Sequence, residues 1–269
     1  MTRGGVRQWS RQVAAEGWLA ASSGLESRVV LAGYGLRWLR VLLLLAIWRA
    51  VLGTAAGGRA ASMGLEAVLT YTLVAEACRE LLSCRTAVQW SLWDGSYVTR
   101  CLRPMGLFTQ FSAEALGPWV LNVGLFSLPL LLVAPWLGVR AGPAGAGAGL
   151  LAALSLGLGV GVGLALEYLF GAVLFYVGNS HWTVDAIRQA LTVILSGALI
   201  PLPLMPWGLG QVLEWLPFAS VASAPLLIYT GHGNPGPLLA AQLAWCLLLW
   251  PAATAAWRAS RERMVPHGG

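Results

Sequence analysis

The sequence predicts an all-α polytopic membrane protein, on three observations. Of its 269 residues, 57% are hydrophobic and only 10% are charged, whereas soluble domains carry about 25% charged residues. Several apolar runs also reach the roughly 20 residues that a helix needs to cross a bilayer. The sequence lacks the many short strands of alternating polarity that a membrane β-barrel would need. We therefore expect six transmembrane helices.

The first predicted element is an amphipathic interfacial helix within a cytoplasmic segment of residues 1–37. Ser23-Gly24-Leu25-Glu26 has the form of a capping box that would begin this helix. The helix would carry Arg28, Arg37 and Arg40 among aliphatic residues, a composition suited to the membrane surface. A cytoplasmic extension of the first span would fit the same residues, so both interpretations stay open.

Six apolar segments follow and make up a transmembrane domain of residues 38–257. They cover residues 38–56, 64–83, 113–137, 147–176, 182–200 and 237–257. The fourth segment carries Gly157, Gly159, Gly161 and Gly163, and small residues four apart let helix backbones approach closely. Close packing is the simpler interpretation of this glycine pattern, and a conformational hinge is the alternative.

Arginine sets the predicted orientation, because it supplies all 17 basic residues and cytoplasmic segments carry an excess of positive charge. With the N-terminus in the cytoplasm and six crossings, 14 arginines face the inside. Arg59 and Arg140 face the outside, and Arg49 lies within the first span. Both termini, including the basic tail 258–269, are therefore expected in the cytoplasm.

Residues 201–228 hold five prolines and are not expected to form one regular span. Counting them as a seventh span would place Arg258, Arg261 and Arg263 outside, against the arginine bias. Irregular backbone at membrane depth is tolerated only where protein or water surrounds it. We expect an outer re-entrant pair of short helices between the last two spans, with Pro206 beginning the first and Pro217 separating them.

Three residue types limit the chemistry of the chain. It contains no lysine, so it cannot supply the P-loop lysine that reaches nucleotide phosphates. Its four cysteines form no CxxC pair and its three histidines lie far apart, so we expect no metal site and no catalytic site. The net charge of +6 follows from membrane topology, so no nucleic acid is expected as a partner.

Charged residues inside the predicted spans are substrate-path candidates, because charges at membrane depth usually pair or face a cavity. Glu76 shares a helix face with Arg79 near the cytoplasmic end of the second span, which favours an internal pair. Glu167 in the fourth span could attract a cationic amphiphile, pair with Arg49 or Arg188, or stay protonated. Glu76 and Glu167 are therefore the two candidates.

The stretch WDGSYVTRCLRP, residues 93–104, is polar although apolar blocks flank it. It lies in residues 84–112, the segment between the second and third spans, which the arginine count places in the cytoplasm. Asp94 or Ser96 can cap a short helix here, and Pro104 would end it. The segment is either a solvated loop with interfacial tryptophans or a docking element for a soluble subunit.

Two runs resemble ABC-2-type transporter permeases, in particular a bacterial six-span subfamily. DGSYVTRCLRP, from Asp94 to Pro104, is similar to their cytoplasmic coupling loop, which contains a glycine and then leucine-arginine-proline. LSGALIPLPLMPWGLGQVLEWLPF, residues 195–218, is similar to their second signature, in which serine-glycine leads to prolines and Leu-Pro-Phe. One departure is Cys101-Leu102, where subfamily members often carry two leucines. The resemblance covers nearly the whole chain.

The resemblance implies the membrane subunit of an ABC exporter in the bacterial cytoplasmic membrane. Two permeases, identical or different, would pair in the lipid bilayer, and each would seat a cytoplasmic ABC ATPase, two copies per transporter. ATP and Mg²⁺ would be bound by the ATPase, and this chain would hold no cofactor. The substrate would be an amphiphile such as a drug, natural product, peptide or lipid-like molecule, moved by alternating access.

The resemblance also assigns roles to residues. ATPase coupling would fall to Asp94, Gly95, Arg100, Leu102, Arg103 and Pro104. An outer gate would be formed by Gly197, Pro201, Pro206, Pro217 and Phe218. Two other functions remain as alternatives, namely a non-transporting membrane anchor or sensor for an ATPase, and an intramembrane hydrolase with Ser196 as nucleophile.

Overall fold

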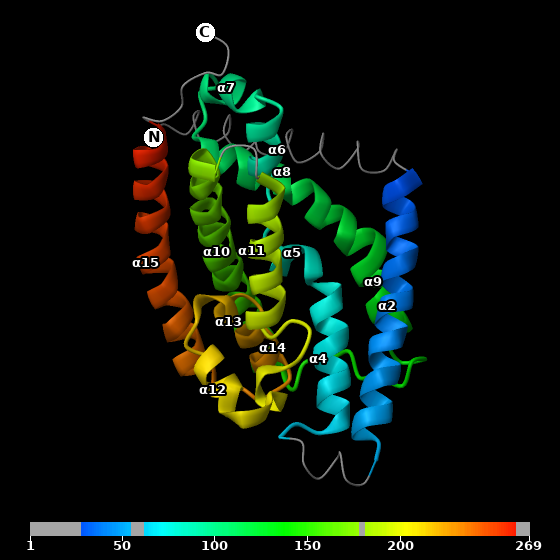
Figure 1. Cartoon of the computed structure of the whole chain (residues 1–269). Helices are drawn as coiled ribbons and strands as arrows, with labels where there is room; N and C mark the ends of the chain where they lie inside the picture. Colours follow the sequence, from blue (N-terminus) through cyan, green and yellow to red (C-terminus); the bar gives the residue numbers. More distant parts are fainter. Residues whose placement is uncertain (1–27, 55–61, 178–180, 262–269) are drawn as a thin grey trace.

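The computed structural model describes residues 28–54, 62–177 and 181–261, and these residues form helices and connecting segments without a strand. The all-α prediction is therefore confirmed for the described part of the chain. The long helices are α2 (Arg28–Leu52), α4 (Leu65–Ala77), α8 (Leu107–Asn122), α9 (Leu128–Val133), α10 (Ala146–Val177), α11 (His181–Leu195) and α15 (Pro235–Arg261). Figure 1 shows them side by side in alternating directions, with α8 and α9 as one tilted segment.

Among the described residues, three helical segments are long and apolar enough to cross a membrane, by length and composition. They are Leu107–Val133, Ala146–Val177 and Pro235–Ser260. These segments correspond to the third, fourth and sixth predicted spans and confirm the membrane character of the chain. The count of six spans stays a prediction.

Short helices lie at both ends of the bundle. At one end are α6 (Val88–Trp93) and α7 (Ser96–Cys101), which α5 (Arg79–Ser83) joins to α4 (Figure 1). Towards the other end lies a series of short turns, made of η2 (Leu202–Leu204), η3 (Pro206–Gly208), α12 (Leu209–Leu213), α13 (Pro217–Val221) and α14 (Ser223–Tyr229). We call residues 196–229 the outer segment, from their predicted side of the membrane.

The structure corrects the predicted boundary between the interfacial helix and the first span. Residues 28–37 belong to the same helix as residues 38–52, because no proline interrupts the run between them. This continuity agrees with an extension of the first span, and the place of residues 28–37 at the cytoplasmic membrane surface stays a prediction. The capping box Ser23–Glu26 lies outside the described residues.

Three other predicted spans have different ends or an interruption. The second span breaks at Cys78, between α4 and α5. The third begins at Leu107 rather than residue 113 and contains a π-helical turn, η1 (Val123–Ser127). The fifth ends at Leu195 rather than residue 200, because Gly197 adopts a φ of 74° that a helix cannot continue.

Helix α10 is the centre of the molecule, and its contacts with α13, α14 and α15 are close. A Cβ atom added to Gly159 would lie 2.8 Å from the carbonyl oxygen of Val221, and one added to Gly163 would overlap Cys84 Sγ. A Cβ added to Gly157 would meet nothing within 4 Å. The predicted close packing is therefore found at two glycines of the pattern and not at Gly157.

Candidate functional site

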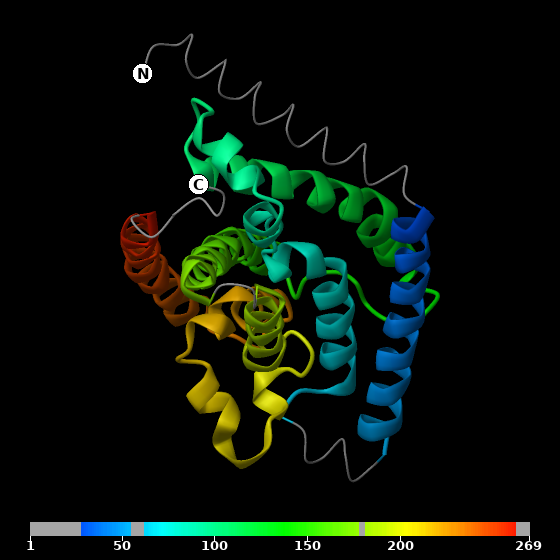
Figure 2. The same cartoon turned by 45° about the horizontal axis from the view of Figure 1, so that its top comes forward.

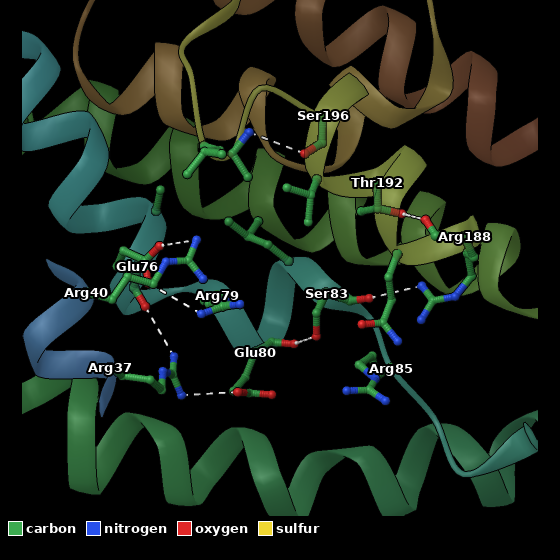
Figure 3. Close-up of a pocket in the computed structure, with 16 residues that line it drawn as sticks. Arg37, Arg40, Glu76, Arg79, Glu80, Ser83, Arg85, Arg188, Thr192 and Ser196 are labelled. Atoms are coloured by element: carbon green, nitrogen blue, oxygen red, sulfur yellow. Dashed lines mark hydrogen bonds and ion pairs between the residues drawn. The ribbon is translucent and has the colours of Figure 1, made fainter. Parts of the chain in front are cut away.

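A cavity of about 300 Å³ lies among α2, α4, α5 and the outer part of α11, and it is the candidate site. Its charged lining consists of Arg37, Arg40, Glu76, Arg79, Glu80, Arg85 and Arg188. The rest of the wall consists of Ala75, Leu82, Ser83, Gln189, Thr192, Val193, Ser196, Ala198 and Leu199. Figure 3 shows Arg37, Arg40 and Arg79 at the left, Arg85 and Arg188 at the right, and Ser196 above them. The cavity therefore has a cationic part and an apolar part.

Ion pairs join α2 to α4 and α5 along this cavity. Arg37 Nη1 lies 3.1 Å from Glu80 Oε1, and Arg40 Nη2 lies 3.1 Å from Glu76 Oε1. The other oxygen of Glu76 lies 3.9 Å from Arg79 Nη1. Residues three or four apart share a helix face, so the two arginines of α2 meet two carboxylates on successive turns. Glu76 thus lines the cavity while it takes part in the internal pair.

The break between α4 and α5 is held by the π-helical turn η1. Asn122 Nδ2 and Ser127 Oγ donate hydrogen bonds of 3.0 and 2.6 Å to the carbonyl oxygen of Ala77. Arg37 Nη1 donates a 2.7 Å hydrogen bond to Asn122 Oδ1, and its guanidinium lies 4.3 Å from the ring centre of Phe126. These contacts satisfy a buried carbonyl that the break would otherwise leave unpaired and fix the position of Arg37.

A second, more deeply buried cluster connects α10 and α11 to Arg85 and Thr86, which follow α5 in the chain. Arg188 Nε lies 2.7 Å from Glu167 Oε2, and the two side chains are 4% and 2% exposed. Glu167 Oε1 accepts 3.0 Å hydrogen bonds from the backbone N–H and the hydroxyl of Thr86. Asp185 lies 3.3 Å from Arg188 and 3.5 Å from Arg85. Of the partners considered for Glu167, Arg188 is the one found, and Glu167 lies outside the cavity lining.

The short helix predicted between residues 97 and 102 corresponds to α7 (Ser96–Cys101), and its place in the cytoplasm stays a prediction. Asp94 Oδ1 accepts a 2.8 Å hydrogen bond from the backbone N–H of Ser96. Gly95 precedes the helix with a φ of 74°, in the left-handed region that favours glycine. Hydrogen bonds from the side chain and backbone of Ser96 hold the pKa of Asp94 below its usual range. The helix ends at Cys101, shortly before Pro104, as the sequence predicts.

The residues of α7 divide into an inward set and an outward set. Arg100 Nη1 lies 2.7 Å from Glu114 Oε2, and the guanidinium lies 4.9 Å from the ring centre of Phe111. Arg100 therefore ties α7 to α8. Val98 and Leu102 point away from the molecule and are 62% and 83% exposed. The other exposed coupling candidates are Asp94, Gly95, Arg103 and Pro104.

The predicted gate residues all lie in the outer segment. The carbonyl oxygen of Gly197 accepts a 2.8 Å hydrogen bond from the hydroxyl of the buried Tyr71, which ties this segment to α4. Pro201 precedes η2, Pro206 begins η3, Pro217 begins α13, and Phe218 packs against the core around α10. Pro206, expected to begin the first short helix, begins η3, and Pro217, expected to separate the two helices, begins α13.

Three residues of the two clusters were not singled out from the sequence, namely Thr86, Asn122 and Asp185. Asp185 precedes Arg188 by three residues inside a predicted span, so the cost of a charge at membrane depth could have identified it. Asn122 is a polar side chain inside an apolar span and carries a weaker form of the same signal. Thr86 carries no such signal, because a threonine is ordinary in a connection.

Ser196, the nucleophile of the hydrolase alternative, is buried at the end of α11. Its Oγ accepts a 3.3 Å hydrogen bond from the N–H of Ala198, and its carbonyl oxygen accepts one of 3.0 Å from the N–H of Ser223. The ring of His232 lies 2.9 Å from the carbonyl oxygen of Thr230 instead. These contacts give Ser196 a structural role, which is to join the end of α11 to α14.

Comparison with known proteins identifies the family. A family model described as ABC-2 family transporter protein matches residues 65–268, and no curated protein matches the chain. The matched region runs from α4 to α15 and includes the cytoplasmic segment, α11 and the outer segment. Permeases of this family are the membrane subunits of ABC transporters, are not themselves catalytic, and work with an ABC ATPase. The chain therefore belongs to the ABC-2 family of transporter permeases.

Proposed function

We propose that the chain is the membrane subunit of an ATP-driven exporter in a bacterial cytoplasmic membrane. It would cross the membrane six times, through α2, α4 with α5, α8 with α9, α10, α11 and α15, with α6 and α7 in the cytoplasm. The positions of the ends support this orientation, because the first residues of α2, the last residues of α15 and α7 lie at the same end (Figure 1). That end carries Arg100 and Arg103, as the positive-inside tendency requires.

The observation that carries this proposal is the outward face of α7. Leu102 and Val98 stand exposed on a short helix beyond the ends of the long helices, and the exposed charges Asp94 and Arg103 lie beside them. An apolar anchor with a polar rim is the usual composition of a protein interface. Since the chain has no lysine for a P-loop, the partner would be the ATPase, and that ATPase would bind ATP and Mg²⁺.

Two sets of contacts would pass a movement of α7 to the bundle. Arg100 holds α7 to α8 through Glu114. At the other side, Thr86 begins the connection to α6 and is bonded to Glu167 of α10, which is paired with Arg188 of α11. A tilt of α7 would therefore shift α8 directly and α10 and α11 through this cluster.

Two such permeases, identical or different, would form one transporter with two ATPases. The cavity beside α11 would take the substrate from the cytoplasmic side or the inner leaflet. The outer segment would act as the lid, because it lies towards the opposite end from α7 and meets the cavity wall at Ser196 and Ala198 (Figures 1 and 2). Alternating access would then consist of closing one end while opening the other.

Purification from native membranes in mild detergent, followed by mass spectrometry of the bound proteins, tests the proposal. We expect a soluble P-loop ATPase to stay bound. A second six-span protein alongside it would indicate a heterodimer, and its absence a homodimer. Recovery of no ATPase with a complex shown to be intact would contradict the proposal, and bound ATPase without substrate-stimulated turnover would indicate an anchor or sensor.

The docking surface is tested with Leu102→Ala and a matched control, Leu132→Ala. Leu132 lies on α9, away from α7, and is 72% exposed against 83% for Leu102. Truncation of a central apolar anchor costs roughly 2 kcal/mol or more, so ATPase recovery with Leu102→Ala should fall by about tenfold or more. Recovery with Leu132→Ala should not change. Equal recovery with both variants would remove Leu102 from the docking surface.

A further inference from the structure

We infer that the cavity binds an amphiphile with an anionic head group, such as a phosphate or a carboxylate, next to Arg40 and Arg79. This inference rests on the proposed function, in which the cavity lies on the transport path. It narrows the substrate class and departs from the cationic amphiphile that Glu167 suggested. Three observations carry it.

The first observation is the charge of the lining. Five arginines and two glutamates line the cavity. The carboxylates that neutralise Arg188 and Arg85 belong to Glu167 and Asp185, which stand outside the lining. The surface that a ligand would meet is therefore strongly cationic.

The second observation is that two arginines share one carboxylate. Glu76 is the ion-pair partner of both Arg40, at 3.1 Å, and Arg79, at 3.9 Å. Counting every carboxylate paired with the lining arginines, four acids face five arginines among the described residues. One guanidinium charge is left over, at the position of Arg40 and Arg79. An opposite charge nearby stabilises a charged guanidinium, and an anionic head group would supply it.

The side-chain exposures agree with this placement. The side chains of Arg40 and Arg79 are 34% and 42% exposed, whereas that of Glu76 is 5% exposed. A ligand in the cavity would therefore meet the two guanidinium groups more readily than the carboxylate between them. A guanidinium offers a planar fork of donors that suits phosphate and carboxylate oxygens. A cationic head group would meet the arginines instead of Glu76.

The third observation is the apolar remainder of the wall. Beyond the charged residues, the lining includes the apolar side chains of Leu82, Val193, Ala198 and Leu199. Ligand sites are mostly apolar with a few convergent polar groups, and they span roughly 300–1,000 Å³. A cavity of about 300 Å³ with this division suits a small head group and the first part of an apolar body.

The test uses three probes with the purified chain in nanodiscs of zwitterionic lipid. Dodecyl phosphate, dodecyltrimethylammonium and inorganic phosphate are titrated calorimetrically, with empty nanodiscs as the blank. We expect saturable binding of dodecyl phosphate only. Equal binding of the cationic probe would overturn the anionic preference. Inorganic phosphate that binds as tightly as dodecyl phosphate would overturn the amphiphile.

Substitutions of Arg79 test whether dodecyl phosphate binding depends on the arginine charge that exceeds the paired carboxylates. Arg79→Gln should weaken dodecyl phosphate binding by about tenfold, because it removes one charge-assisted contact. Arg79→Lys should retain most of the affinity. The control is Arg140→Gln, because Arg140 also forms a 3.9 Å ion pair, with Glu66, at an exposed site outside the cavity. Equal affinity of Arg79→Gln and Arg140→Gln would overturn the site.

The failure of this inference can be told apart from the failure of the proposed function. The binding experiments use the permease alone and need no ATPase. If the ATPase is recovered and its turnover responds to dodecyltrimethylammonium rather than dodecyl phosphate, the transporter stands and the substrate class is wrong. If no ATPase is recovered from an intact complex, the proposed function fails whatever the probes show.

Discussion

At the scale of single residues, the pair of Glu167 and Arg188 is the most constrained feature of the molecule. Both side chains are almost fully buried, and their charged groups lie 2.7 Å apart. Burying a charge is costly, and the cost is offset only while its partner and hydrogen bonds are in place. Thr86 supplies two of those hydrogen bonds to Glu167. Glu167, Arg188 and Thr86 therefore hold α10, α11 and the start of the connection to α6 together only while all of these contacts are in place.

Glu167→Gln should destabilise the protein by about 3–5 kcal/mol, because it leaves the Arg188 charge buried without its partner. The measurement is the midpoint of thermal unfolding in detergent. Glu66→Gln is the matched control, since Glu66 forms a 3.9 Å pair with 78% of its side chain exposed, and it should cost little. A Glu167→Gln variant with normal stability and lowered transport would favour a direct role in the substrate path.

Asp94 gives a second prediction, concerning pH and the cap of α7. Because its pKa is lowered in the folded protein, its contribution to α7 is complete above the ordinary value of about 3.9. That contribution is lost only as the pH falls through the lowered pKa. ATPase recovery should therefore not change between about pH 6 and 8 because of Asp94. If ATPase recovery changed with pH in that range, and Asp94→Asn removed the change, this assignment would be wrong.

The same residue can be tested by substitution. Asp94→Ala removes the acceptor for the Ser96 N–H and should speed amide hydrogen exchange in the first turn of α7 several-fold, whereas Asp94→Asn keeps an acceptor and should not. Hydrogen exchange measured by mass spectrometry compares the two. Equal exchange in both variants would show that the cap is not needed.

At the scale of elements, the close packing of α10 depends on glycines, which have no side chain. A Cβ at Gly159 would stand 2.8 Å from the Val221 carbonyl oxygen and 3.0 Å from that of Ser220. Both contacts are backbone atoms, so α10 and α13 would have to separate. The glycine pattern thus sets how closely the outer segment sits against the centre of the bundle.

Gly159→Ala should cost about 1–3 kcal/mol, as overpacking does elsewhere. Gly157→Ala is the control, because a Cβ there meets nothing within 4 Å, and replacing a helical glycine by alanine is worth roughly 1 kcal/mol in favour of the helix. The midpoints of thermal unfolding of the two variants are compared. Equal midpoints would show that α13 moves aside at no cost.

Elements also show what local sequence could and could not predict. Pro104 and Pro217 act within their own turns, so the end of α7 and the start of α13 follow from the sequence alone. The break at Cys78 does not, because Asn122 and Ser127 from a distant segment satisfy the carbonyl of Ala77. The pair of Glu167 with Arg188 was one of several possibilities in the sequence, and only the packing of α10 against α11 selects it.

At the scale of the whole molecule, the cysteines can report the orientation. Cys101 is exposed on α7, Cys84 is buried, and Cys78 and Cys246 are half-buried. A membrane-impermeant maleimide should therefore label Cys101 in inside-out vesicles and not in right-side-out ones. Cys101→Ser should abolish the labelling. Labelling of Cys101 from the outer face would overturn the proposed orientation.

The two charged regions also differ in their response to salt. The Debye length falls to about 3 Å at 1 M salt, and such screening acts on exposed charges far more than on buried ones. Asp94 and Arg103, on either side of α7, are exposed, whereas Glu167 and Arg188 are buried among the helices. Concentrated salt should therefore weaken the binding of the ATPase and leave the permease folded. The ATPase and the permease could then be separated in salt and recombined when the salt is removed by dialysis.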